Sequence, residues 1–339
     1  MKKKLLCLAG AAAAWTAWCA RRNKKYPLVD EYPLFNKFVI PGNLLSHPFL
    51  HTANSRLVSM KPPAPPQGIR RMERWAETKD GDRIRLTFYQ PEDLKGNIPC
   101  LVYFHGGGFC LRDAPYIHGI AAEYARKGRC MTVLVHYRTS DRHPFPVPFR
   151  DCCAGLDYVR KHAKEFHIDE TRIAAGGDSA GGALAAACAL WEREQGRTLC
   201  FQMLIYPVLD ARMKTASMKK YTDSPLWNAR LTKKMWEHYL RNGDMGMRRF
   251  ASPLEAVDFR KLPPAYIEVE EFDCLHDEGV RFWNKLCRAG VPARLEDVKG
   301  TFHGFDVRKD TMISRRMRRI RAEALHEVFW KPESAQKAK

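Results

Sequence analysis

Gly177-Asp178-Ser179-Ala180-Gly181 is the stretch of sequence that indicates the fold most directly, because it has the form Gly-x-Ser-x-Gly. An apolar run typical of a buried strand, residues 172–175, precedes it, and an alanine-rich helical segment, residues 183–191, follows it. On a sharp turn between strand and helix, side chains two residues either side of the serine would collide, so glycine is needed there. Such a pentapeptide arises by chance in about one chain in ten, but its strand-turn-helix setting makes Ser179 a candidate nucleophile.

A second glycine motif, His105-Gly106-Gly107-Gly108, follows another apolar strand candidate, residues 100–104. Consecutive glycines let backbone amides approach a negatively charged oxygen as it forms in a transition state. We expect the amides of Gly107, Gly108 and Ala180 to form such an oxyanion hole. A flexible turn is the alternative for this motif in isolation, and the presence of both motifs in one chain argues against it.

Apolar runs and helical segments alternate along the chain, which predicts an α/β fold with a mostly parallel, eight-stranded sheet flanked by helices. The strand candidates are residues 70–76, 83–89, 100–104, 131–136, 172–175, 201–205, 265–269 and 293–298. Helical periodicity is clearest in residues 117–127, 149–166 and 180–194. Residues 210–253 contain no strand candidate and one amphipathic helix candidate, residues 231–240, so they are predicted to be an insertion over the carboxyl edge of the sheet.

A nucleophilic serine needs a histidine as base and a carboxylate as the acid that orients it. In a fold of this kind the acid follows the serine in the chain, and the histidine follows the acid. Asp273 comes just after the predicted strand 265–269, and His303 comes just after the last predicted strand. Loops at strand ends are where such groups meet. The sequence therefore predicts Ser179, Asp273 and His303 as a catalytic triad, with Asp277 as the reserve candidate for the acid.

These motifs together resemble the hormone-sensitive lipase family of α/β-hydrolases, which includes arylacetamide-deacetylase-like esterases. The similarity spans about residues 70–330 and rests on five separated motifs in family order. They are His105-Gly106-Gly107-Gly108-Phe109, Tyr137-Arg138 with His143-Pro144-Phe145-Pro146, Gly177-Asp178-Ser179-Ala180-Gly181-Gly182, Asp273-Cys274-Leu275-His276-Asp277-Glu278-Gly279 and His303-Gly304-Phe305.

The resemblance implies an α/β-hydrolase fold with a helical cap, and it implies that Asp273 rather than Asp277 is the triad acid. The chain departs from the family at Thr139-Ser140-Asp141-Arg142, where Leu-Ala-Pro-Glu is usual, and at Cys274, where proline is usual. The predicted organisation is a signal-like or anchor segment (1–25), an N-terminal cap part (26–60), a first core part (61–209), a cap insertion (210–250), a second core part (251–331) and a polar tail (332–339).

The predicted function is that of a serine carboxylesterase or lipase-like hydrolase, which cleaves short- to medium-chain esters through an acyl-enzyme and needs no cofactor or metal ion. A deacetylase or amidase that acts on acetylated small molecules is the alternative within enzymes, and an inactive binding protein is the alternative outside them. Five large side chains in the cap segments suit either an apolar substrate pocket or plain core packing, and these are Phe35, Phe38, Trp227, Met235 and Trp236.

The formal net charge is +19 and the pI is about 9.5, yet no nucleic-acid-binding signature accompanies this charge. The basic runs are residues 2–4, 21–25, 233–234 and 315–321, and we expect them to form a solvated surface without a specific nucleic-acid partner. The eleven cysteines are scattered and odd in number, which argues against a disulfide framework and favours a reducing compartment.

Residues 5–20 form an apolar, alanine-rich stretch between two basic clusters. Sixteen helical residues rise about 24 Å, whereas the hydrocarbon core of a bilayer is roughly 30 Å thick. The segment is therefore either a marginal membrane anchor, an interfacial helix or a cytosolic cap helix. The predicted location is the cytoplasm or a membrane surface reached through residues 1–25, and the sequence leaves open whether the chain forms a homodimer.

Overall fold

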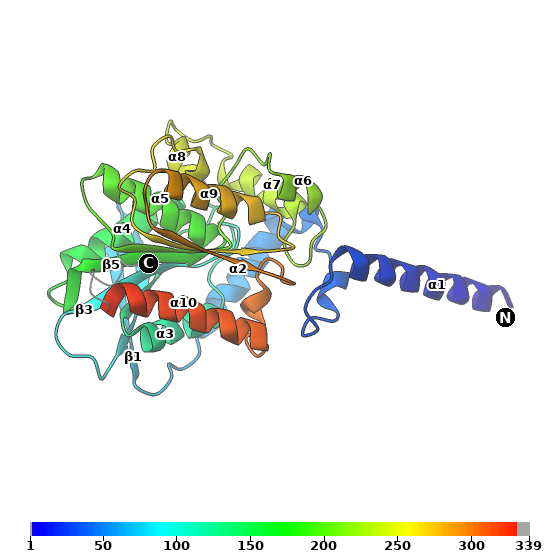
Figure 1. Ribbon diagram of the computed structural model, residues 1–339, viewed down its shortest axis with the longest axis horizontal. Helices are drawn as coiled ribbons and strands as arrows, with labels where there is room; N and C mark the ends of the chain where they lie inside the picture. The colour runs from blue at the N-terminus through cyan, green and yellow to red at the C-terminus, as the bar shows by residue number, and fades with distance from the viewer. Residues whose placement is uncertain (1, 331–339) are drawn as a thin grey trace.

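An eight-stranded sheet runs through the middle of the protein in the computed structural model, which describes residues 2–330 (Figure 1). The order of the strands is β1-β2-β4-β3-β5-β6-β7-β8. Their bounds are β1 Ile69–Glu77, β2 Arg83–Pro91, β3 Ile98–Phe104, β4 Met131–His136, β5 Ile168–Asp178, β6 Phe201–Ile205, β7 Ala265–Glu270 and β8 Ala293–Val298. The predicted eight-stranded α/β sheet is confirmed, because each strand candidate lies within one of these strands.

Strand direction explains where functional side chains gather. β1 and β2 form an antiparallel hairpin, β2 is antiparallel to β4, and the remaining neighbours are parallel. Asp80-Gly81 makes the hairpin turn, and Gly81 takes a positive φ of 85° that favours glycine. Because β3 to β8 run the same way, the loops that follow them meet at one edge of the sheet.

Helices cover both faces of the sheet (Figure 1). On one face lie α3 (Pro115–Gly128) and α10 (Met312–Trp330), and on the other lie α4 (Val147–Lys161), α5 (Ala180–Glu194) and α9 (His276–Arg288). Helix α5 is buried along almost its whole length, and its many alanines let it lie close to the strands.

One helix ends earlier in the structure than the sequence predicts. The helix expected over residues 149–166 ends at Lys161, because the chain turns before β5 and His167 adopts a positive φ of 52°. Phe166 stacks on Phe88 of β2 with ring centroids 4.6 Å apart. Its apolar character therefore serves packing against the sheet and does not extend the helix.

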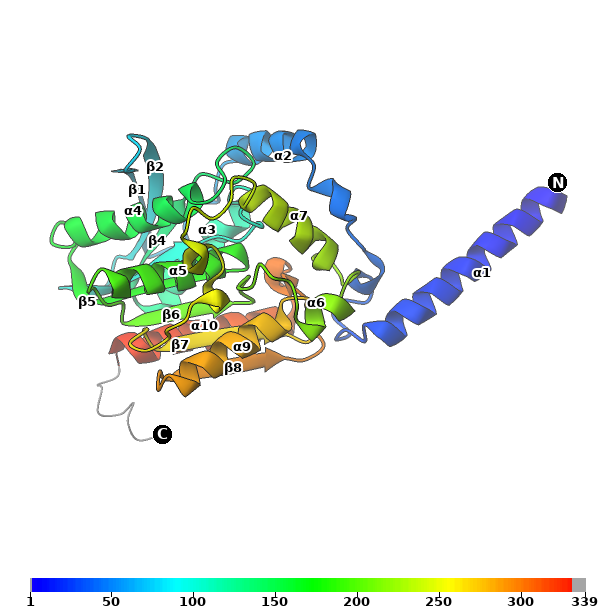
Figure 2. The ribbon, with the colours of Figure 1, turned by 90° about the horizontal axis from the view of Figure 1, so that it is seen from above.

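Two groups of short helices lie beyond the carboxyl edge of the sheet (Figure 2). The first group contains η1 (Phe35–Lys37), η2 (Gly42–Leu44) and α2 (His47–Ser59), and the second contains α6 (Ala216–Lys220) and α7 (Ala229–Tyr239). The two groups touch each other: the Asn228 side chain donates to the Ile40 carbonyl at 2.9 Å, and the His238 ring lies 2.6 Å from the Leu45 carbonyl. The next two short helices, α8 (Arg248–Ala251) and η3 (Pro253–Glu255), pack against α5 over one face of the sheet. A last short helix, η4 (Phe305–Val307), follows β8.

Helix α1 (Lys2–Lys25) extends away from the rest of the protein (Figures 1 and 2). Its last turn is tied to the second group of helices, because Arg22 and Lys25 bind the Asp223 carboxylate at 2.8 and 2.5 Å. Among residues 2–330, no helix combines the length and the apolar character that crossing a bilayer requires. Association of residues 1–25 with a membrane surface stays a prediction.

Candidate active site

Ser179 occupies the sharp turn between β5 and α5. Its backbone has φ 56° and ψ −117°, a strained combination for a residue with a side chain. A Cβ atom at Gly181 would lie 1.9 Å from the Phe104 carbonyl oxygen, and one at Gly177 would lie 2.4 Å from the Gly181 carbonyl carbon. The two glycines are therefore required by close backbone contacts, and the turn points the serine hydroxyl out of the carboxyl edge of the sheet.

The side chain of His303 lies within hydrogen-bonding distance of both other side chains of the predicted triad. His303 Nε2 is 2.8 Å from Ser179 Oγ, and His303 Nδ1 is 2.6 Å from Asp273 Oδ2. The second oxygen of Asp273 accepts the Leu275 amide at 2.9 Å, which fixes the carboxylate. All three residues are buried, so water competes little for these contacts.

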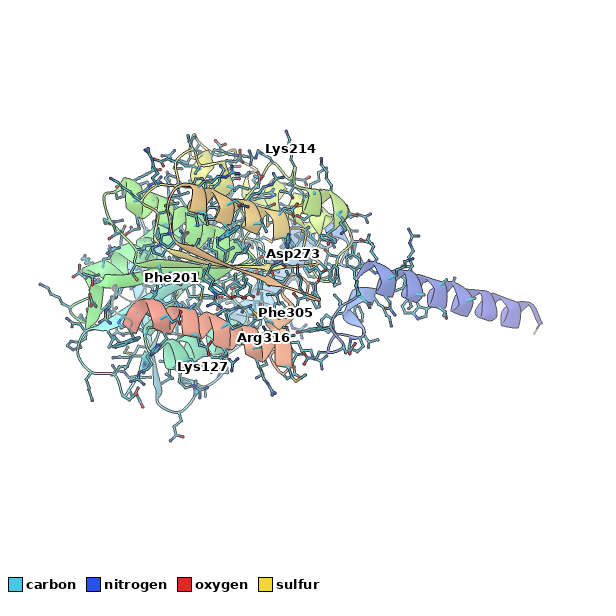
Figure 3. The ribbon with its side chains drawn as sticks, viewed as in Figure 1. Lys127, Phe201, Lys214, Asp273, Phe305 and Arg316 are labelled. Carbon is cyan, nitrogen blue, oxygen red and sulfur yellow. The ribbon has the colours of Figure 1, made fainter. Side chains whose placement is uncertain are left out.

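The reserve acid points elsewhere. One oxygen of Asp277 accepts the Ser217 amide at 2.8 Å, and the other lies 3.1 Å from the His276 ring. Figure 3 shows Asp273 and Phe305 towards one end of the sheet and Phe201, the first residue of β6, towards the other. The geometry therefore favours Asp273 over Asp277 as the partner of His303.

The glycine-rich loop after β3 lies beside the serine turn. Gly107 and Gly108 have φ angles of 114° and 60°, which favour glycine. Among residues 2–330, no backbone oxygen accepts the amide of either glycine. Ala180 is the first residue of α5, where helix amides have no intrahelical acceptor. These amides can thus serve a negatively charged oxygen, as the sequence predicts.

Asp178 braces the two loops, a role that the sequence motif did not reveal. Tyr103 donates a hydrogen bond to Asp178 Oδ1 at 2.8 Å, and a Cβ atom at Gly106 would lie 2.3 Å from Oδ2. Burial raises the pKa of the Asp178 carboxyl to about 6. Gly106 is therefore needed for close packing against Asp178.

Two aromatic rings flank the imidazole of His303. The Tyr206 ring approaches it edge-on at 4.7 Å between centroids, and the Trp227 ring lies 5.9 Å away. The Tyr206 hydroxyl donates to Asp306 Oδ1 at 2.8 Å. Tyr206 directly follows β6, but no sequence pattern distinguishes it from an ordinary core tyrosine.

A buried ion-pair network lies beneath Tyr206, and it corrects one sequence expectation. Arg321 pairs with both Asp306 and Glu268. The basic run 315–321 was expected to be solvated, which is wrong for Arg318 and Arg321, whose exposed fractions are 8% and 1%. The reason is that α10 turns these two side chains inwards. Arg321 pairs with the buried carboxylates of Glu268 and Asp306, which offset the cost of removing its charge from water. Arg318 donates to the Asp306 carbonyl at 2.7 Å and lies 3.6 Å from the partly buried Glu123 carboxylate.

Three residues near the glycine-rich loop have the donor set of a metal site. Asp113 lies 3.1 Å from His118 Nε2 and 2.9 Å from His136 Nδ1, and the remote nitrogens of the two rings contact the Tyr89 and Thr87 hydroxyls. These hydrogen bonds satisfy the cluster without an ion. The Arg85 guanidinium also lies 3.5 Å from His136 Nδ1, where it opposes a cation. We assign the cluster a bracing role between β2, β4 and α3.

A separate cleft of about 830 Å³ lies between the β1–β2 hairpin and helices α4 and α5. Trp75, Phe149 and Trp191 are among the residues that line it. None of its lining residues belongs to the predicted triad or oxyanion hole. The cleft therefore has no place in the site described above.

Comparison with known proteins agrees with this geometry. Residues 101–307 match a family model described as alpha/beta hydrolase fold, which covers more than half of the chain. The chain belongs to this family. The result confirms the resemblance that the five motifs indicate, and it confirms the predicted α/β-hydrolase fold.

Several relatives and structural neighbours are named as esterases. Carboxylesterase NlhH of Mycobacterium tuberculosis is 31% identical over 261 residues, which cover 76% of this chain and 82% of NlhH. Esterase LipI of the same organism is 32% identical over 61% of this chain, and the chain spans 65% of LipI. Among solved structures, a bacterial heroin esterase superposes with a TM-score of 0.82 at 32% identity, covering 90% of this chain and 99% of the esterase.

Proposed function

We propose that this α/β-hydrolase is a serine carboxylesterase that cleaves small carboxylic esters, with Ser179, His303 and Asp273 as its catalytic triad. The unbroken chain of hydrogen bonds from Asp273 through His303 to Ser179 supports this function most strongly. The esterase relatives support the same reaction class. A deacetylase or amidase, the alternative from the sequence, has no comparable support.

The mechanism follows from the positions of these atoms. His303 Nε2 takes the proton of the Ser179 hydroxyl as the oxygen attacks the ester carbonyl. The carbonyl oxygen becomes negatively charged and is stabilised by the amides of Gly107, Gly108 and Ala180. Asp273 holds the imidazole in the required orientation and stabilises its positive charge. His303 then protonates the leaving alcohol, and water activated by His303 hydrolyses the acyl-enzyme in the second half of the reaction.

Loss of the nucleophile tests the proposal directly. Ser179→Ala should abolish hydrolysis of p-nitrophenyl acetate, while circular dichroism and thermal unfolding stay like those of the parent protein. Ser217→Ala, which changes a buried serine outside the predicted triad, is the matched control and should retain activity. Hydrolysis by Ser179→Ala at a rate near that of the parent would refute the assignment.

Two predictions about partners accompany this function. Association with a membrane surface through residues 1–25 predicts that deleting these residues moves the protein to the soluble fraction of cells. An unchanged distribution would contradict it. The oligomeric state is tested by light scattering, where a homodimer would have twice the mass of 39.0 kDa calculated for one chain.

A further inference from the structure

The indole ring of Trp227 lies across the front of the proposed catalytic site. A Cβ atom built on Gly108 would lie 2.7 Å from Trp227 Cη2, so the outer edge of the indole covers this oxyanion-hole glycine. The same ring is 5.9 Å from the imidazole of His303, tilted by 38°. Trp227 thus extends from the oxyanion-hole loop to the proposed base, beside the position that the ester carbonyl takes during attack by Ser179.

Hydrogen bonds hold the indole in this position. Trp227 Nε1 donates to Thr232 Oγ1 at 2.9 Å, and the Trp227 carbonyl accepts the Ser224 hydroxyl at 2.7 Å. Thr232 Oγ1 also lies 3.4 Å from Cys274 Sγ, next to the proposed triad acid. The indole therefore cannot move aside without losing its hydrogen bond to Thr232, and the Ser224 bond holds the backbone that carries the ring.

The other cap aromatics that the sequence offers as pocket residues are used differently. Trp236 is buried and packs on Phe109 and Tyr239, with ring centroids 5.8 and 5.9 Å apart. Phe35 stacks on Phe302 at 5.4 Å, and Phe38 is 59% exposed. Trp227 is partly exposed, so a substrate can touch it.

We propose that Trp227 limits the length of the acyl group that the site accepts, an inference that rests on the proposed esterase function. The leaving oxygen must approach His303 Nε2 to receive its proton, and the carbonyl oxygen must approach the amides of Gly107 and Gly108. The edge of the indole overlies Gly108, whose amide would receive the carbonyl oxygen, so on this proposal the ring crowds the acyl side of the carbonyl. We expect acetyl and propionyl groups to fit beneath the ring and longer chains to meet it.

The test compares acyl chains of different length on one leaving group. The kcat/KM of the parent protein should fall at least tenfold from p-nitrophenyl acetate to p-nitrophenyl octanoate. In Trp227→Ala, the ratio of the octanoate to the acetate value should rise at least tenfold. Thr232→Val keeps the shape of the residue 232 side chain but removes the hydroxyl that fixes the indole. This variant should raise the octanoate-to-acetate ratio by a smaller factor.

Trp236→Phe is the matched control, because it alters a cap tryptophan that lies in the core, and its ratio should equal that of the parent. Acetate esters of short and long alcohols give a second control, since Trp227→Ala should leave their relative rates within threefold. An unchanged acyl ratio in a folded Trp227→Ala protein, or a change confined to the alcohol series, would overturn the inference. If Ser179→Ala also remains active, the proposed function itself fails.

Discussion

At the carboxyl edge of the sheet, the turn that carries Ser179 is held by close contacts between backbone atoms. The helices beyond that edge are instead held by side chains from distant parts of the chain. Gly181 has so little room that a single Cβ atom would reach the Phe104 carbonyl. The proposed cap segments, residues 26–60 and 210–250, meet through side-chain contacts, among them the hydrogen bond of Asn228 with Ile40 and the ring contact of His47 with His238. A change at the edge should therefore disrupt the site, and a change in the cap should shift stability or specificity.

Gly181→Ala should have the largest effect, because its Cβ atom would lie 1.9 Å from the Phe104 carbonyl oxygen. We expect loss of both esterase activity and cooperative unfolding, measured with p-nitrophenyl acetate and by urea titration. Gly119→Ala in α3 is the matched control, since its Cβ atom meets nothing within 4 Å. This control should be stabilised by up to about 1 kcal/mol, as expected for alanine in a helix. Normal activity in Gly181→Ala would show that the edge is less rigid than we describe.

Asp273→Asn should leave the fold intact and lower kcat by about 10⁴, because asparagine cannot hold the imidazole in the reactive tautomer or stabilise its positive charge. Asp277→Asn should retain most of the activity, since Asp277 binds the Ser217 amide and the His276 ring. Steady-state kinetics on both variants measures the difference. Equal losses would mean that both carboxylates act on His303.

Asp178→Asn should change how stability depends on pH. Burial raises the pKa of the Asp178 carboxyl from 3.8 to about 6. A raised pKa means that the folded protein favours the protonated carboxyl. The contribution of Asp178 to the free energy of unfolding is therefore fully present below about pH 4, and it is lost as the pH rises through about 6. Asparagine carries no charge, so the variant should gain roughly 3 kcal/mol relative to the parent between pH 4 and pH 8. Urea unfolding across this range measures the gain, and a constant difference would contradict the buried position of Asp178.

Asp223→Ala in the cap should have the smallest effect. Asp223 accepts hydrogen bonds from Arg22, Lys25 and Tyr26, but it is partly exposed, and ion pairs of this kind contribute about 1 kcal/mol or less. We expect a slightly lower free energy of unfolding and faster proteolysis near residue 25. Asp93→Ala, which breaks the exposed pair with Arg129, is the control and should cause neither. A loss of activity as large as that of Asp273→Asn would erase the contrast between edge and cap.

The same contrast explains which features could be predicted from the sequence. The strands and the two glycine motifs are local: each depends on residues within a short stretch whose packing and backbone geometry leave few alternatives. Asp273 and His303 could be assigned because strand order brings the ends of β7 and β8 to the same edge as Ser179. Local motifs and the order of the strands were therefore sufficient to predict most of the proposed site.

Features that depend on distant partners could not be predicted. Arg321 has the appearance of a surface residue in a basic run, and only its long-range pairing with Glu268 explains its burial. Trp227 was one of five candidate pocket residues, and only the folded cap shows that it reaches Gly108 while Trp236 packs in the core. The early end of the helix at Lys161 likewise depends on the contact of Phe166 with Phe88.

Reaction with a fluorophosphonate, followed by peptide mass spectrometry, tests the central claim most directly. The reagent forms a stable bond with a serine hydroxyl that a neighbouring base activates. We predict modification of Ser179 alone, and a rate at least 10³-fold lower in His303→Ala, because the base lies 2.8 Å from the hydroxyl. Modification of a different serine, or an equal rate in His303→Ala, would contradict the account.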